Sequence, residues 1–333
     1  MTRFSDVRLL TGFRCRSRRG FSLIEMCAAS AISLVLIGSM LAIINHVTAV
    51  WMQARGNTQT FAAAADTFDS MTHKLSQAVL NTYWSYDDPS RPTRYVRASE
   101  LHFVLGRASD LLGLPAASHP GSAVFFQAPL GRTLDGHTSK LTSRLNAMGY
   151  FTAFGAMPGI PDLLNDLPTN PRFRLFEWLE PTGDLSVYAN ATGTDWFRQD
   201  AGGGQTSPNG SVAGVNIIGF FILAEYPLPN GTWKLSYTYD SRDAAVPETL
   251  NQLPPRLRVV LAAIDDASAG RLAAASGSNP PSLAPPEGAF EDPANFDTDL
   301  QNWENALAAH VPKITSRIFS TTIAIPNSRW SVP

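Results

Sequence analysis

Glu25 is the residue of this chain that is hardest to explain as structure alone, because it lies near the start of a long apolar run. Residues 27–44 carry no charge, and with residues 21–26 they are about as long as the roughly 20 residues that cross a bilayer. An ionised side chain in such a segment costs about 3 kcal/mol unless it is paired or solvated. A plain anchor gains nothing from that cost, so Glu25 indicates a functional site.

The residues in front of the apolar run are strongly basic. Residues 1–20 hold one acid, Asp6, and six arginines: Arg3, Arg8, Arg14, Arg16, Arg18 and Arg19. By the positive-inside rule this end lies in the cytoplasm, and the rest of the chain is then predicted to lie outside. The remainder has an excess of acidic over basic residues and no basic cluster, which argues against nucleic acid as a partner.

Three ordinary targeting signals compete for the same segment. A secretory signal peptide has a shorter apolar core, of about 7–15 residues. Residues 17–23 resemble a twin-arginine signal, but the length of the run and Glu25 speak against it. A lipoprotein signal ending at Cys27 is disfavoured by Glu25 and Met26 just before it, so we interpret Cys27 as a small packing residue.

The segment Arg-Gly-Phe-Ser-Leu-Ile-Glu, residues 19–25, resembles the processing motif of type IV prepilins and type II secretion pseudopilins. In that family a prepilin peptidase cuts after the glycine, here Gly20, and the new N-terminal residue, here Phe21, is N-methylated. The family's glutamate, here Glu25, neutralises the amino terminus of a neighbouring subunit during assembly. The physical chemistry agrees, since a cation created beside the bilayer needs a carboxylate partner.

The resemblance implies a pilin-like subunit that assembles through its N-terminal helix into a pilus, pseudopilus or secretion-associated complex. Its implied partners are a prepilin peptidase, other pilin-like subunits and the bacterial inner membrane, with a periplasmic body after a single span. Many major pilins have a proline kink in the first helix and a C-terminal disulfide loop. This chain has neither, and its only cysteines are Cys15 and Cys27, which favours a minor or pseudopilin role.

Motifs for catalysis are missing from the sequence. No two of the six histidines lie within four positions of each other, which excludes a helical two-histidine metal motif. There is no Gly-x-Ser-x-Gly elbow, phosphate loop or dinucleotide fingerprint. We therefore predict no enzyme activity and no cofactor. The alternative is an exported enzyme or binding domain on an uncleaved anchor or a twin-arginine signal.

Asp297 and Asp299 are the best candidates for a metal site, because clustered oxygens suit calcium. The glycine and the remaining ligand spacing of a calcium loop are absent, so we predict a solvated loop and no metal.

The elements that position these residues begin with one long helix. The chain has 24 prolines, and the first is Pro89, so no proline interrupts residues 1–88. We predict a leader over 1–20, a membrane-spanning half-helix over 21–45 and an amphipathic half-helix over 46–82. The second half has an apolar stripe that should pack along its own body, formed by Val47, Ala54, Phe61, Phe68 and Leu75.

The body, residues 83–333, reads as an α+β fold with a mostly antiparallel sheet on the distal half of the helix, a pilin-like arrangement. Apolar and alternating runs predict strands at Val96–Leu105, Ala123–Gln127, Val215–Tyr226, Trp233–Tyr239, Leu257–Ile264 and Ile318–Ile325. Asn230-Gly231 predicts a hairpin turn, and Leu134–Met148 predicts a helix. Residues 200–210 and 266–290 read as flexible inserts.

Part of the body resembles known groups as well. Ala123–Leu130, Leu145–Phe151, Arg172–Leu179 and Pro254–Ala262 are similar to segments of the Verru_Chthon cassette protein C group. The run Leu253–Leu261 is similar to the late strand of the minor pseudopilin J family. Both resemblances imply the same pilin-like context.

Overall fold

The computed structural model describes residues 22–132, 143–155, 171–183, 185–189, 193–201, 209–277, 279–283, 285 and 288–331. The chain forms two compact units, residues 1–54 and 55–333. Helix α1 (Leu23–Ser76) belongs to both, which confirms the long first helix. It ends six residues before the predicted boundary at 82, because Val79 leaves the helix for a β-bridge in which its N–H donates to Gln127 O at 2.9 Å.

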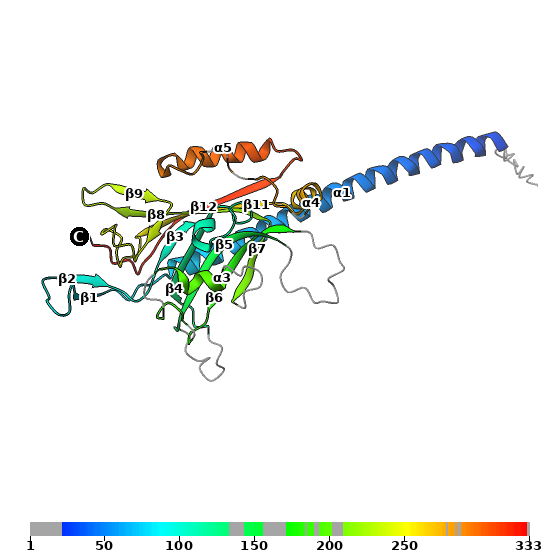
Figure 1. The fold of residues 1–333 in the computed structure, drawn as a ribbon. Coiled ribbons are helices and arrows are strands. Elements are labelled where there is room, and N and C mark those ends of the chain that lie inside the picture. The colour runs from blue at the N-terminus through cyan, green and yellow to red at the C-terminus, as the bar shows by residue number, and fades with distance from the viewer. Residues whose placement is uncertain are drawn as a thin grey trace, which may run out of the picture. The chain divides into compact units, whose positions relative to one another are not determined.

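The described residues of the second unit form three antiparallel sheets, which confirms the α+β class and the antiparallel pairing. Figure 1 labels their strands. The six-stranded sheet has the order β10 (Tyr239–Asp240), β3 (Val104–Arg107), β4 (Ser122–Pro129), β5 (Leu145–Gly155), β6 (Arg172–Glu180) and β7 (Gly210–Val215). The four-stranded sheet has the order β12 (Ser316–Ala324), β11 (Arg256–Ile264), β8 (Ile217–Pro227) and β9 (Trp233–Ser236). A separate hairpin pairs β1 (Tyr83–Tyr86) with β2 (Tyr95–Ala98).

The distal part of the predicted apolar stripe of α1 packs into the first of three cores that the described residues of this unit form: Phe68 and Leu75 are buried there and Phe61 is partly buried. The prediction is wrong for Val47, which is 57% exposed. Ala64, Phe68, Met71 and Leu75 are buried there, against side chains from one face of each large sheet. Those strand residues include Val124 and Phe126 from β4, Phe220 and Ile222 from β8, and Val259 and Leu261 from β11. The distal half of the helix therefore covers the body to which it belongs.

The other faces of the two large sheets form the second and third cores. Successive residues of a strand point to opposite faces, so Phe125 of β4 packs on α2 (Ala108–Leu112) and α3 (Asp195–Ala201), not on α1. In the same way Phe221 of β8 packs toward α4 (Asp266–Ser276) and α5 (Phe296–Ala308). Strands β4 and β8 are therefore buried on both faces, which explains their nearly continuous apolar sequences.

The predicted turn at Asn230-Gly231 is confirmed. It joins the paired strands β8 and β9, and Leu228 N–H donates to Thr232 O at 2.8 Å across it. Gly231 has a φ of 82°, a conformation in which glycine is favoured because it has no Cβ.

Four predictions in the body were wrong. The runs Val96–Leu105 and Trp233–Tyr239, each predicted as a single strand, are each divided between two strands of different sheets, the first between β2 and β3 and the second between β9 and β10. Residues 145–148, placed in a helix from Leu134 to Met148, belong to β5, where they pair with both β4 and β6; residues 133–142 lie outside the described residues. Residues 266–276, predicted as part of a flexible insert, form α4, because Asp265 caps the helix by accepting from Ser268 N–H at 2.9 Å. Of the other insert, residues 202–208 lie outside the described part.

Candidate functional site

The predicted processing junction, Gly20 and Phe21, lies outside the described residues. Cleavage between them and methylation of Phe21 therefore stay predictions. Glu25 is described, and it lies in the first turn of α1.

Glu25 and Ser22 form a reciprocal cap at the start of α1. Ser22 N–H donates to Glu25 Oε2 at 2.9 Å, and Glu25 N–H donates to Ser22 Oγ at 3.2 Å. This capping box satisfies two backbone donors that the first turn of a helix leaves without partners. Glu25 Oε1 makes no hydrogen bond to any described residue, so one carboxylate oxygen is open to a further donor.

The helix that follows is apolar on every side and exposed. Leu23, Val35 and Trp51 are 85%, 71% and 66% exposed, and the other large apolar side chains between them are exposed as well. This helix is long and apolar enough to cross a membrane by length and composition. A helix that is hydrophobic all round is typical of a membrane span or of a deeply buried core.

Three hydroxyl side chains of this segment are bonded within the helix itself. Ser30 Oγ donates to Cys27 O at 2.9 Å, Ser39 Oγ to Leu36 O at 2.8 Å, and Thr48 Oγ1 to Ile44 O at 2.7 Å. Such back-bonding to the preceding turn removes hydroxyl donors that would otherwise be costly in hydrocarbon. At these three positions the segment is therefore chemically suited to an apolar surrounding.

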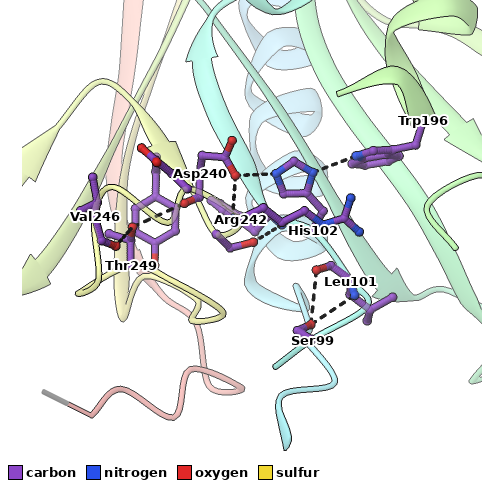
Figure 2. A network of polar contacts seen from close by, with 12 residues as sticks. Ser99, Leu101, His102, Trp196, Asp240, Arg242, Val246 and Thr249 are labelled. Carbon is purple, nitrogen blue, oxygen red and sulfur yellow. Dashed lines mark hydrogen bonds and ion pairs between the residues drawn. The ribbon is translucent and has the colours of Figure 1, made fainter. Parts of the chain in front are cut away.

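A second polar cluster joins three elements of the body, and its centre is the fully buried side chain of His102 (Figure 2). His102 Nε2 lies 2.6 Å from Asp240 Oδ1, and Trp196 Nε1 donates to His102 Nδ1 at 2.9 Å. An indole nitrogen can only donate, so Nδ1 is the acceptor and the ring proton is on Nε2, which donates to Asp240.

This arrangement has little capacity for acid–base catalysis, because both ring nitrogens already have partners. Burial lowers the pKa of His102; the hydrogen bond to Asp240 and its charge oppose that shift without reversing it. Burial alone would raise the pKa of Asp240, but its hydrogen bond with His102 and the N–H of Arg242 leave it below the ordinary value. The cluster links β10, α3 and the residues that enter β3, a structural role that no local sequence motif indicates.

The two metal candidates of the sequence are on α5, not in a solvated loop. Arg258 forms an ion pair with Asp297, and Asp299 Oδ2 accepts from Phe290 N–H at 2.9 Å. Both acids lie in the first turn of the helix, where the helix dipole favours negative charge. Among the described residues, no group of three or more His, Cys, Asp or Glu side chains is arranged to hold a metal ion.

Comparisons with known proteins show a distant likeness to a solved structure. No protein-family model matches the chain, and no curated protein matches it. Among solved structures the chain is similar to a type IV-like pilin from Thermus thermophilus, with a TM-score of 0.32 and 12% identity over 80% of this chain and 96% of that chain. A likeness this distant says nothing about function.

Proposed function

We propose that this chain is a pilin-like subunit, anchored in a membrane by the first part of α1 and working by assembly with other pilin-like subunits, not by catalysis. The observation that carries the proposal is the exposed apolar helix that is long enough to cross a membrane and whose first turn holds the carboxylate of Glu25. The resemblance of residues 19–25 to the prepilin processing motif supports it.

The proposal includes processing between Gly20 and Phe21 by a prepilin peptidase, followed by N-methylation of Phe21. Co-expression with such a peptidase and mass spectrometry of the purified chain is the direct test. We expect a mature N-terminus at methylated Phe21. A chain that begins at any other residue, or that keeps its basic leader, would favour the alternative of an exported domain on another kind of signal.

In the assembled state, Glu25 is proposed to pair with the amino terminus of Phe21 on a neighbouring subunit. The capping box uses Oε2, so Oε1 is the atom proposed to accept from that ammonium group. Breaking a buried ion pair from one side costs about 3–5 kcal/mol, and about 1.4 kcal/mol is already a factor of ten in an equilibrium. Glu25→Leu should therefore abolish most cross-linking between subunits, and Glu25→Asp should be intermediate because its reach is shorter.

Ser22→Ala is the matched control for Glu25, because it removes the cap and leaves the carboxylate. Loss of an N-terminal cap costs about 1 kcal/mol of helix stability. If Glu25 acts in assembly, Ser22→Ala should still be cleaved, inserted and cross-linked. If Glu25 only caps the helix, the two variants should behave alike, and that outcome would remove Glu25 from the assembly proposal.

A further inference from the structure

A polar cavity of about 430 Å³ lies in the body where α1 gives way to β1. Its wall comes from three segments that are far apart in the sequence, residues 79–82, 251–253 and 326–329. Its volume is within the range of about 300–1,000 Å³ that is usual for sites that bind small organic molecules. Its lining is dominated by amide and other polar side chains, so it suits a polar ligand.

Two amides of the wall are fixed so that their carbonyl oxygens are left as acceptors. Asn251 Nδ2 donates to Arg97 O at 2.7 Å, and Asn327 Nδ2 donates to Ala78 O at 3.1 Å. These bonds set the direction of each amide, and neither Oδ1 atom is bonded to a described residue. Both oxygens are therefore available to a ligand's hydroxyl groups.

Arg329 supplies the charge of the cavity. Its exposed guanidinium group makes no hydrogen bond or ion pair with any residue that the structure describes. A guanidinium presents donors in a planar fork that matches a carboxylate. The cavity therefore combines acceptors for hydroxyl groups with a donor for an anionic group.

Beside the cavity, the β1–β2 hairpin presents an aromatic face. Trp84, Tyr86 and Tyr95 are 65%, 49% and 65% exposed. The register pairs Tyr86 with Tyr95 and Trp84 with Arg97, which places all three rings on one face with Arg97. The two tyrosine rings stack with centroids 5.0 Å apart. Exposed rings gathered in this way mark a surface for binding, not for packing.

The aromatic face and the cavity are joined through Arg97. Its Nη1 donates to Ser331 O at 2.8 Å, and Ser331 N–H donates to Gln252 Oε1 at 2.8 Å. Gln252 is a residue of the cavity wall. The rings therefore extend from the side of the cavity, so that one elongated ligand can contact both.

We propose that this surface binds an acidic glycan, a chain of sugar rings that carry hydroxyl groups and carboxylates. The apolar C–H face of a sugar ring lies well against an aromatic ring, whose own face carries partial negative charge. The hydroxyl groups donate to Asn251 and Asn327, and a carboxylate pairs with Arg329. We favour a glycan over a peptide because the three rings lie on one face of the hairpin, where successive sugar rings can stack on them.

The test is calorimetric titration of the full-length protein in detergent with oligogalacturonate, compared with a neutral glucose oligomer of the same length. We expect the acidic oligomer to bind about tenfold or more tightly than the neutral one. Arg329→Gln should remove that preference, and Arg329→Lys should keep part of it. Trp84→Ala should weaken binding of the acidic oligomer by about tenfold.

Two matched substitutions of exposed residues elsewhere in the body serve as controls. Arg317→Gln on β12 and Trp233→Ala on β9 should leave the affinity unchanged, and thermal unfolding should show every variant folded. The proposal is overturned if neither oligomer binds, if both bind equally, or if Arg329→Gln has no effect. It is also overturned if a short peptide with a free carboxyl terminus binds more tightly than the glycan and depends on the same residues.

Discussion

At the scale of single residues, buried His102 makes the stability of the body depend on pH. Burial holds its pKa below the ordinary value of about 6.5. Below that pH the unfolded chain takes up a proton that the folded chain does not. The contribution of His102 to the free energy of unfolding is therefore fully present above about pH 6.5 and is lost as the pH drops toward the lowered pKa. His102→Gln should flatten this fall, measured as the urea midpoint between about pH 7.5 and 5.

His119 is the comparison for that measurement, because burial lowers its pKa as well. A contact between its ring and the backbone oxygen of Pro115 opposes that shift without reversing it. His119→Gln should remove only its own share of the pH dependence, and the double variant should be flatter than either single one. An unchanged slope in His102→Gln would contradict the assignment of a neutral buried ring.

Gly149 offers a second prediction at this scale. A Cβ there would lie 2.2 Å from Cδ1 of Phe125. The ring of Phe125 is stacked on that of Phe197, so it cannot move away without losing that packing. Gly149→Ala should lower the free energy of unfolding by about 1–3 kcal/mol through overpacking. In Gly270→Ala, within α4, the new Cβ meets nothing within 4 Å, so it should raise that free energy by up to about 1 kcal/mol. Chemical unfolding compares the two, and equal effects would refute the packing argument.

At the scale of elements, one ion pair fastens the distal part of α1 to the six-stranded sheet. Lys74 Nζ lies 2.7 Å from Glu177 Oε2, and Tyr150 OH donates to the same oxygen at 2.7 Å. Glu177→Leu leaves both partners unpaired and should cost about 2–4 kcal/mol. Lys74→Met should cost about 1 kcal/mol, because the lysine side chain is 24% exposed and keeps some water.

A double-mutant cycle of these two substitutions measures the coupling, which we expect to be about 1–2 kcal/mol. If the two costs simply add, the ion pair has no part in fastening α1, which is then held by apolar packing and by the hydrogen bond from Thr67 Oγ1 to Ala213 O.

Some helices and strands can be predicted from the sequence, and others cannot. The long first helix could be predicted because prolines are absent from it, and β8 and β11 because their apolar runs are continuous. The local pattern of residues 145–148 does not predict the strand β5, because these residues become a strand by pairing with neighbours on both sides. The composition of α4, rich in alanine, serine and glycine, predicts a loop and not the helix that forms.

The functional residues also differ in whether the sequence alone predicts them. The sequence indicates Glu25 as a functional residue because a charge in an apolar run is anomalous, and the spacing of Ser22 and Glu25 is also that of a capping box. His102 and Asp240 are 138 positions apart, so only the pairing of β3 with β10 brings them together. A cavity built from three distant segments is equally invisible to a sequence pattern.

At the scale of the whole molecule, the proposed anchor predicts a single orientation. The arginines at positions 14, 16, 18 and 19 should keep the leader in the cytoplasm. A phosphatase fused after Pro333 should then be active, because it folds only outside the cytoplasm, and a fluorescent protein that matures only inside should be dark. Replacing the four arginines with glutamine should weaken this preference. A C-terminal fusion that is active inside the cytoplasm would contradict the proposed topology.

The last strand, β12, covers the first helix, since the ring of Phe319 lies 6.0 Å from that of Phe68 and packs on the first core. The two residues are roughly 250 positions apart, and contacts of such separation form late. A ribosome adding about 5–20 residues per second makes Phe68 about ten seconds or more before Phe319. Throughout that interval the stripe of Phe68, Met71 and Leu75 lacks its final cover, so we expect the growing chain to expose an apolar surface that holding chaperones can bind until its synthesis is almost finished.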